Sequence, residues 1–279
     1  MTKKSQRRTR SSSRETEAAL LIWSDSPKAF ARKIARLASI SDYRLLTRDP
    51  QAIHDVYFDT PARALQAQKL ALRVRRVGRS SWITLKGPGP STDWGGVDRL
   101  EIEAAWSEDA LARVIKELAD RGIELRQPHE DLGDAPPLDV MRSMGLEVIQ
   151  NRRDRRRVRN IVPVEEGLVA NDEDDGPVLA ELAIDAVVYH FSGQDVRLYE
   201  LEVEAKIRRG SRVLRDVIAG LVARYGPALR RWRYGKLVTG RAIEELLSEG
   251  ALEGLMDDGG HLKPVALDKI DDHLRSGGV

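Results

Sequence analysis

Alternating carboxylates mark the segment 199–206, which reads YELEVEAK. On a strand, successive side chains point to opposite faces, so Glu200, Glu202, Glu204 and Lys206 would share one face and the apolar side chains between them the other. A helix would instead set Glu200 and Glu204 as a destabilising like-charge pair at i,i+4. Carboxylates spaced roughly 6.6 Å apart along a strand repel one another unless water, cations or basic groups face them. The segment is therefore either a solvated sheet face or one wall of a charged site.

Basic side chains alternate in the same way over residues 71–86. Arg73 and Arg75 lie in the first arm of a predicted β-hairpin and Lys86 in the second, opposite the apolar positions. The next predicted strand, 97–105, carries both basic and acidic side chains on one face. Its charged side chains are Arg99, Glu101 and Glu103.

Six of the eight residues from 152 to 159 are arginine. On a strand, Arg153 and Arg155 share a face with Arg157 and Arg159. Such a run could bind nucleic acid, but no interleaved aromatic residues or nucleic-acid motif accompany it, which argues against a nucleic-acid partner. The alternative is pairing with the acidic strands. We expect Arg153 and Arg155 to face the site, although Arg152 and Arg156 belong to the other register.

Two further strands carry carboxylates on one face. Residues 15–23 contain Glu15 and Glu17 at a spacing of two, and residues 178–189 place Asp185 on the charged face. Between the strands, apolar stripes at helical spacing predict helices over 27–39, 108–121 and 207–225.

Composition limits the class of protein. The chain has 279 residues, 41% of them hydrophobic, and 46 basic against 44 acidic residues, a net charge of +2. It contains no cysteine, which excludes disulfides and thiolate metal sites. No apolar run approaches the ~18 residues of a membrane span, and residues 1–13 form a basic segment that we expect to be a disordered tail. We expect a cytoplasmic protein with no membrane partner.

At least five predicted strands are thus charged on one face and apolar on the other. A closed antiparallel barrel would turn the charges into a polar lumen and leave its apolar faces to be covered by helices. Converging arginine and lysine side chains suit a chain of phosphates. Clusters of carboxylates suit Mg²⁺ or Mn²⁺. The sequence therefore predicts an α+β fold that binds a metal–polyphosphate complex.

Several segments together resemble one family. These are YFDTP at 57–61, LALRVRR at 70–76, WITLKG at 82–87, AID at 183–185, ELEVEAK at 200–206 and YGK at 234–236. The combination resembles the CYTH domain, the triphosphate tunnel metalloenzyme family, over about residues 14–247. The expected organisation is a tail over 1–13, a tunnel domain over 14–247 and a peripheral C-terminal extension over 248–279.

The resemblance implies a closed eight-stranded antiparallel β-barrel with helices packed outside. It also implies hydrolysis of inorganic or organic triphosphate, or cyclisation of ATP, with Mg²⁺ or Mn²⁺. The implied phosphate-binding residues are Arg73, Arg75, Lys86, Arg153, Arg155, Lys206 and Lys236. The implied metal ligands are Glu15, Glu17, Asp185, Glu200 and Glu202. Of these residues, Glu15, Glu17, Arg73 and Lys86 would be catalytic, and Arg99, Glu101, Glu103 and Glu204 would complete the wall.

One position departs from the pattern. The first strand of the family reads E-x-E-x-K, whereas this chain has Ala19 at the lysine position. A lost charged hydrogen bond removes about 1.5–3 kcal/mol of binding free energy. The alternatives to a metal-dependent triphosphatase are therefore a non-catalytic polyphosphate- or nucleotide-binding module and an adenylate cyclase of class IV type. The partner would be a small triphosphate-containing molecule, and a homodimer is the oligomer that we consider.

Overall fold

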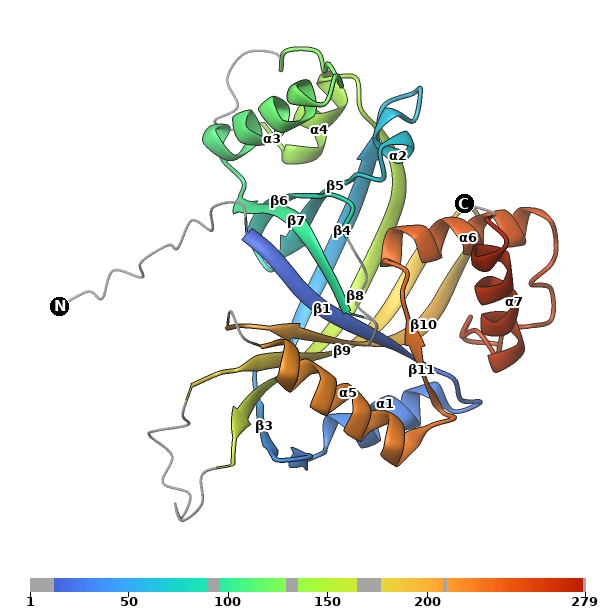
Figure 1. Ribbon diagram of the computed structural model, residues 1–279. Coiled ribbons are helices and arrows are strands. Elements are labelled where there is room, and N and C mark those ends of the chain that lie inside the picture. Colours follow the sequence, from blue (N-terminus) through green and yellow to red (C-terminus); the bar gives the residue numbers. More distant parts are fainter. Residues whose placement is uncertain (1–12, 90–95, 129–134, 165–176, 208–209, 278–279) are drawn as a thin grey trace. The chain divides into compact units, whose positions relative to one another are not determined.

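The computed structural model describes residues 13–89, 96–128, 135–164, 177–207 and 210–277, and in 13–15 and 96–100 only the backbone. Within these residues an antiparallel sheet combines with seven helices (Figure 1). The strands are β1 (Ser13–Ile22), β2 (Ser39–Ile40), β3 (Tyr43–Thr47), β4 (Gln51–Asp59), β5 (Ala71–Val77), β6 (Ser80–Lys86), β7 (Gly96–Ala105), β8 (Glu147–Pro163), β9 (Ala180–Phe191), β10 (Gln194–Ala205) and β11 (Leu229–Trp232). The helices are α1 (Pro27–Ala35), α2 (Ala64–Ala67), α3 (Glu108–Asp120), α4 (Pro137–Ser143), α5 (Ser211–Tyr225), α6 (Lys236–Ser248) and α7 (Pro264–Arg275).

The sheet confirms the predicted α+β class but not the predicted strand number. Its order is β2-β3-β8-β4-β5-β6-β7-β1-β10-β9, with β11 paired to β1 and β8 paired also to β9. The described residues thus hold eleven strands in place of eight, because the short strands β2, β3 and β11 add to the other eight. Closure into a barrel stays a prediction, as does the division into a tail, a tunnel domain and an extension.

Two hairpins have the turns that their sequences predict. Gly78 lies at φ +60° in the turn between β5 and β6, and Gly193 lies at φ +92° between β9 and β10. Left-handed backbone of this kind favours glycine, so each turn fixes the register of its strands. As a result Arg73 lies opposite Thr84, and Glu200 lies opposite Asp185.

The chain forms two compact units. Residues 55–89 and 99–149 make up most of the first unit. There, α3 begins at Ser107, whose Oγ accepts a hydrogen bond from the Ala110 backbone N–H at 3.2 Å. Its stripe of Leu111, Val114 and Leu118 is buried in a core shared with β5, β6 and α4. Burying each such side chain contributes roughly 1.5–3 kcal/mol, which holds α3 against the apolar side of these strands.

The second unit comprises residues 15–54 and 150–279, together with 90–98. Its helices α1 and α5 lie side by side over β9 and β10 (Figure 1). The apolar residues of the opening segment, Leu201 and Val203, are fully buried in this core. That face is therefore covered, and Glu200 and Glu202 occupy the opposite one.

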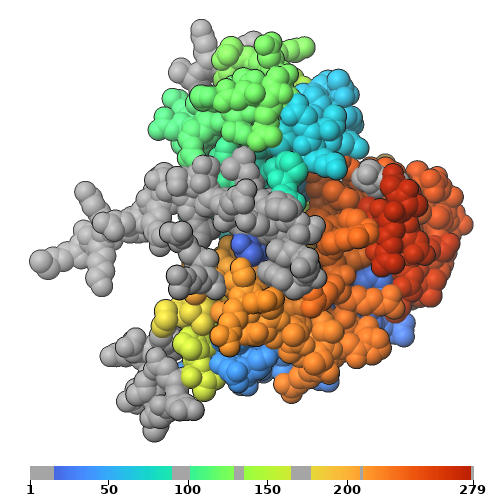
Figure 2. All heavy atoms as spheres, viewed as in Figure 1, coloured from blue at the N-terminus to red at the C-terminus, as the bar shows by residue number. Residues whose placement is uncertain are grey.

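A second core in this unit includes the C-terminal helices. Leu267 and Ile270 of α7 pack with Leu246 of α6 and with β1, β9 and β10. Figure 2 shows α6 and α7 side by side at the surface. None of the described helices is long and apolar enough to cross a membrane.

Candidate functional site

Five charged side chains meet in the second unit on the face of β8, β9 and β10 opposite α1 and α5. Cross-strand register brings four of them together, because Arg156 lies opposite Asp185 and Asp185 lies opposite Glu200, with Glu202 two residues further on. The fifth, Lys236, is the first residue of α6. The sequence predicted four of these five residues at the site and placed Arg156 in the alternative register.

The ammonium group of Lys236 lies among three carboxylates. Its Nζ is 3.2 Å from Glu200 Oε1 and 3.2 Å from Asp185 Oδ2, and it also donates to Glu202 Oε1. The side chain is 6% exposed, so this charge is compensated within the protein rather than by water. Tyr189 fixes the helix start by donating from its hydroxyl to the Lys236 carbonyl at 2.9 Å.

The guanidinium group of Arg156 binds two of the same carboxylates. It forms a bidentate pair with Asp185 at 2.8 and 2.6 Å, and its Nη2 also donates to Glu202 at 2.5 Å. A bidentate fork fixes both distance and plane, so the three groups have a defined mutual orientation.

Burial and neighbouring charges determine the protonation states. Burial raises the pKa of Glu200 to about 8; Lys236 opposes this effect, while Glu202 and Asp185 add to it. Burial also raises the pKa of Asp185, but Arg156 and Lys236 outweigh it and hold that pKa below its usual value. For Lys236, the carboxylates overcome the effect of burial and raise the pKa. At neutral pH Glu200 is therefore protonated, and the remaining two carboxylates balance the two cations.

The surroundings of one Glu200 carboxyl oxygen agree with the protonated state. Its Oε2 is buried and has no hydrogen-bond partner among the described residues. An ionised oxygen in that position would lack compensation, whereas a protonated carboxyl group carries no net charge to compensate.

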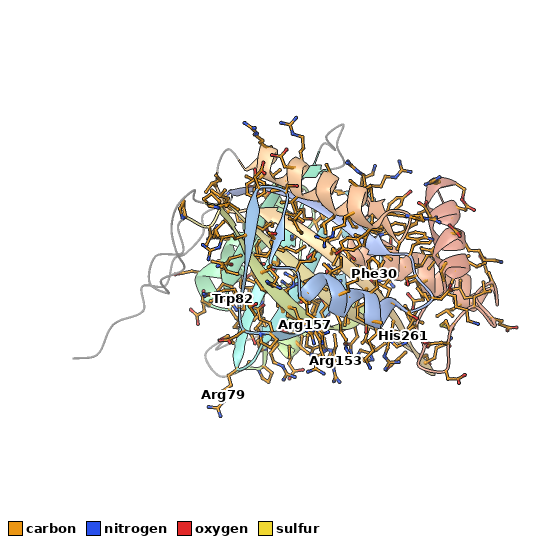
Figure 3. All side chains as sticks on the ribbon, turned by 90° about the horizontal axis from the view of Figure 1, so that it is seen from below. Phe30, Arg79, Trp82, Arg153, Arg157 and His261 are labelled. Carbon is orange, nitrogen blue, oxygen red and sulfur yellow. The ribbon has the colours of Figure 1, made fainter. Side chains whose placement is uncertain are left out.

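The register of β8 is opposite to the one we predicted. Arg153, Arg155 and Arg157 are exposed, and Figure 3 labels the first and the last of them. Arg152 and Asp154 are fully buried, with Arg152 Nε 3.1 Å from Asp154 Oδ1. The expectation that Arg153 and Arg155 face the site is therefore wrong. The exposed positions hold arginine alone, and a row of like charges requires water, whereas the buried positions mix both signs and neutralise themselves. That difference was present in the sequence and could have indicated the register.

A second charged cluster lies in the first unit. The buried Asp55 of β4 accepts a bidentate pair from Arg75 at 2.7 and 2.8 Å, and it lies 3.5 Å from Arg73. Arg73 also lies 3.4 Å from Glu103 and donates to the Tyr57 hydroxyl at 3.4 Å. Sequence reasoning missed Asp55 and Tyr57, although both alternate with the apolar residues of β4.

The predicted residues of β6 and β7 join this cluster. Lys86 lies opposite Glu101 with 3.1 Å between Nζ and Oε1, and the Thr84 hydroxyl donates to Glu103 at 3.3 Å. Burial raises the pKa of Glu103, but Arg73, Arg75 and Lys86 outweigh it, so the pKa lies below its ordinary value. The structure therefore confirms that Arg73, Arg75 and Lys86 share a face with these two carboxylates.

The remaining predicted residues lie elsewhere or outside the described atoms. Glu17 is opposite Glu204, whose carboxylate accepts from Lys206 at 2.7 Å, and Lys206 is also 3.8 Å from Glu181. This group is partly exposed and separate from the contacts of Lys236. The side chains of Glu15 and Arg99 are not among the described ones.

The carboxylates around Lys236 are the candidate ligands for a metal ion in the second unit. Among the described residues, no group of three or more acidic or histidine side chains is arranged to hold a metal. However, three carboxylate oxygens already surround one cation, the Lys236 ammonium. Their chemistry fits a hard divalent cation, and the position that such an ion would take is filled by a positive charge of the protein itself.

Several solved structures are similar to this chain at low sequence identity. No curated protein matches it. A structure from Bacillus halodurans described as a candidate adenylate cyclase is 17% identical, with a TM-score of 0.41, and the match covers 76% of this chain and 90% of that one. The Hippeastrum protein HpAC1, described as having a dominant triphosphatase activity, is 17% identical, with a TM-score of 0.48 and coverage of 82% and 95%. The PH1819 protein of Pyrococcus horikoshii is also 17% identical, with a TM-score of 0.41 and coverage of 84% and 99%.

A family model matches a long continuous part of the sequence. The model describes the CYTH domain and matches residues 26–217, which is more than half of the chain. The matched range includes both charged clusters except Lys236. This chain belongs to the CYTH domain family.

Proposed function

We propose that the chain hydrolyses inorganic triphosphate or a related organic triphosphate with the help of Mg²⁺ or Mn²⁺. The observation that carries this proposal is the buried cluster around Lys236, where a guanidinium group of β8 and carboxyl groups of β9 and β10 meet the ammonium group at the start of α6. Phosphate chains require several cationic donors, and their metal counter-ions require carboxylate oxygens. Membership of the CYTH family supports the same reaction.

The cluster can exchange partners when a metal–triphosphate complex enters. Arg156 and Lys236 now donate to carboxylates, and phosphate oxygens accept from the same donors. Asp185 and Glu202 would then be available to hold the metal ion, and so would Glu200 once it releases its proton. When bound, the metal would supply neutralisation of phosphate charge and activation of water.

Arg73, Arg75 and Lys86 belong to the proposal as further phosphate-binding residues. Asp55 is a positioning residue, because its two oxygens hold the fork of Arg75 in one plane. The closed eight-stranded tunnel that the resemblance implies is also part of the proposal. The pairing of β8 with both β4 and β9 supports it.

The test is phosphate release from tripolyphosphate by the purified chain with Mg²⁺ or Mn²⁺. We expect Lys236→Met to lower kcat/KM by at least a hundredfold, because it removes a donor that contacts all three carboxylates. The control Lys116→Met removes a lysine that is 73% exposed and should leave the rate unchanged. Thiamine triphosphate and ATP serve as parallel substrates. A well-folded protein that releases no phosphate from any of them with either metal contradicts the proposal.

A non-catalytic triphosphate-binding module is the second candidate. Ala19 lies directly opposite Glu202, so the family's missing lysine would have stood beside this cluster. The absence of that cation favours binding without turnover. In that case tripolyphosphate raises the melting temperature while no phosphate appears. The ATP reaction is also examined for cyclic AMP, which would identify a cyclase.

A further inference from the structure

Strand β8 carries an exposed row of arginines that the proposed reaction does not use. Arg153, Arg155 and Arg157 occupy alternate positions of β8, all three on the exposed face. In the part of the chain that the structure describes, their guanidinium groups have neither a hydrogen-bond partner nor an ion-pair partner. Alternate residues of a strand lie roughly 6.6 Å apart, so the row presents three cations in a line. We call these residues the exposed arginine row.

The side chains around the exposed arginine row carry little negative charge that could pair with it. Arg153 and Arg155 lie opposite Val188 and Ala186 of β9, which carry no charge. The nearest strand beyond, β10, contributes Arg197 and Tyr199 at the same register positions. Asp195 is already paired with Arg197 at 2.9 Å, and Asp257 lies 3.1 Å from His261 Nδ1, so neither carboxylate is paired with an arginine of the row.

An aromatic pair lies beside the row. The rings of Tyr199 and His261 stack with centroids 5.9 Å apart and planes inclined by 9°. Burial raises the pKa of Tyr199, and Arg32, Arg157 and Arg197 oppose this effect, which shows that all three cations are near the ring. Figure 3 shows Arg153 and Arg157 on the side where Phe30 and His261 also lie.

This combination differs from a lipid-binding surface. The large apolar side chains that are exposed in the described structure are Val148, Val164, Ile207 and Val265, and none belongs to the row or to the aromatic pair. Nothing here could therefore insert into a bilayer. A line of guanidinium groups with aromatic rings at its side instead suits a backbone of regularly spaced phosphates with unstacked bases.

We propose that the exposed arginine row and the Tyr199–His261 pair form a binding surface for single-stranded nucleic acid. The phosphates lie along the arginines and a base contacts the aromatic pair. This site is distinct from the buried cluster around Lys236, since the arginines of the row and those of the cluster point to opposite faces of β8. Arg32 on the exposed surface of α1 adds a fourth cation.

The experiment measures fluorescence anisotropy of a labelled 20-nucleotide oligouridylate titrated with the full chain between 50 and 200 mM salt. Each phosphate contact contributes about 0.7 to the slope of log K against log salt, so Arg153→Gln/Arg155→Gln/Arg157→Gln should lower the slope by about 2. We expect at least tenfold weaker binding at 50 mM salt. Arg155→Gln alone should lower the slope by about 0.7.

The control variant carries the same change of charge at other exposed sites, Arg76→Gln/Arg79→Gln/Arg215→Gln, and should bind as the wild type does. Tripolyphosphate at micromolar concentration should not displace the oligonucleotide. The proposal is overturned if the wild type does not bind, if the control weakens as much as the row variant, or if tripolyphosphate displaces the strand. Binding of long-chain inorganic polyphosphate without any binding of the oligonucleotide also overturns it.

Discussion

The protonated state of Glu200 makes a quantitative prediction about stability and pH. Its pKa is 4.5 as an ordinary glutamate and about 8 in the folded protein. Between these values the folded state holds a proton that the unfolded state has released. The free energy of unfolding therefore falls by about 1.4 kcal/mol for each pH unit in that interval, and by about 5 kcal/mol in total. This contribution is fully present below pH 4.5 and is lost as the pH rises through 8.

The substitution Glu200→Gln removes this titration while keeping an oxygen that can accept from Lys236. We expect the stability of the variant to depend less on pH than that of the wild type. From pH 6 to 7.5 the wild type should lose about 2 kcal/mol relative to the variant. Urea unfolding followed by tryptophan fluorescence is a suitable assay, because Trp23 and Trp232 are buried in the second unit. EDTA in every sample keeps divalent ions away from the carboxylates.

Glu181→Gln is the matched control. Glu181 lies on β9 as Asp185 does, but its side chain is 24% exposed and faces Lys206. This variant should follow the pH dependence of the wild type. Parallel stability curves for the wild type and Glu200→Gln between pH 6 and 7.5 would refute the reasoning, because they would mean that Glu200 ionises as it does in the unfolded chain.

Three other substitutions test separate parts of the structure. Arg156→Gln should lower the free energy of unfolding by about 3–5 kcal/mol, because it leaves Asp185 and Glu202 with one cation. Its control is the exposed Arg153→Gln, which should change that free energy by less than about 0.5 kcal/mol. Urea titrations measure both. Leu267→Ala in α7 should cost about 2–5 kcal/mol and Val265→Ala, which is 55% exposed, almost nothing, as thermal melts can show. Ala19→Lys should lower the KM for tripolyphosphate roughly tenfold or more, since it adds a charged donor opposite Glu202; an unchanged KM would contradict this role of position 19.

Most of the strands could be predicted because their polar and apolar residues alternate strictly. The hairpin of β5 and β6 is an example: Gly78 fixes the turn, and the charged face of Arg73 and Lys86 follows from the period of two. The short strand β11 and helix α4 were missed, since four to seven residues carry too little periodicity. Lys236 was predicted through a short motif, but its position at the start of a helix that points back to β9 and β10 depends on tertiary packing.

The arginine segment shows why the site could be predicted only in part. A period of two assigns alternate residues to two faces, but it does not say which face is buried. That choice depends on the partners across the strand: Asp185 is fixed on β9 by its own hairpin with β10, and only Arg156 lies in register with it. Once this pair forms, Asp154 and Arg152 are buried together, and Arg153, Arg155 and Arg157 must face water, whereas Arg159 further along is buried and donates to the Leu37 and Leu45 carbonyls. The same pairing that completes the cluster around Lys236 thus creates the exposed arginine row, so the two opposite faces of β8 carry different chemistry as a consequence of one register.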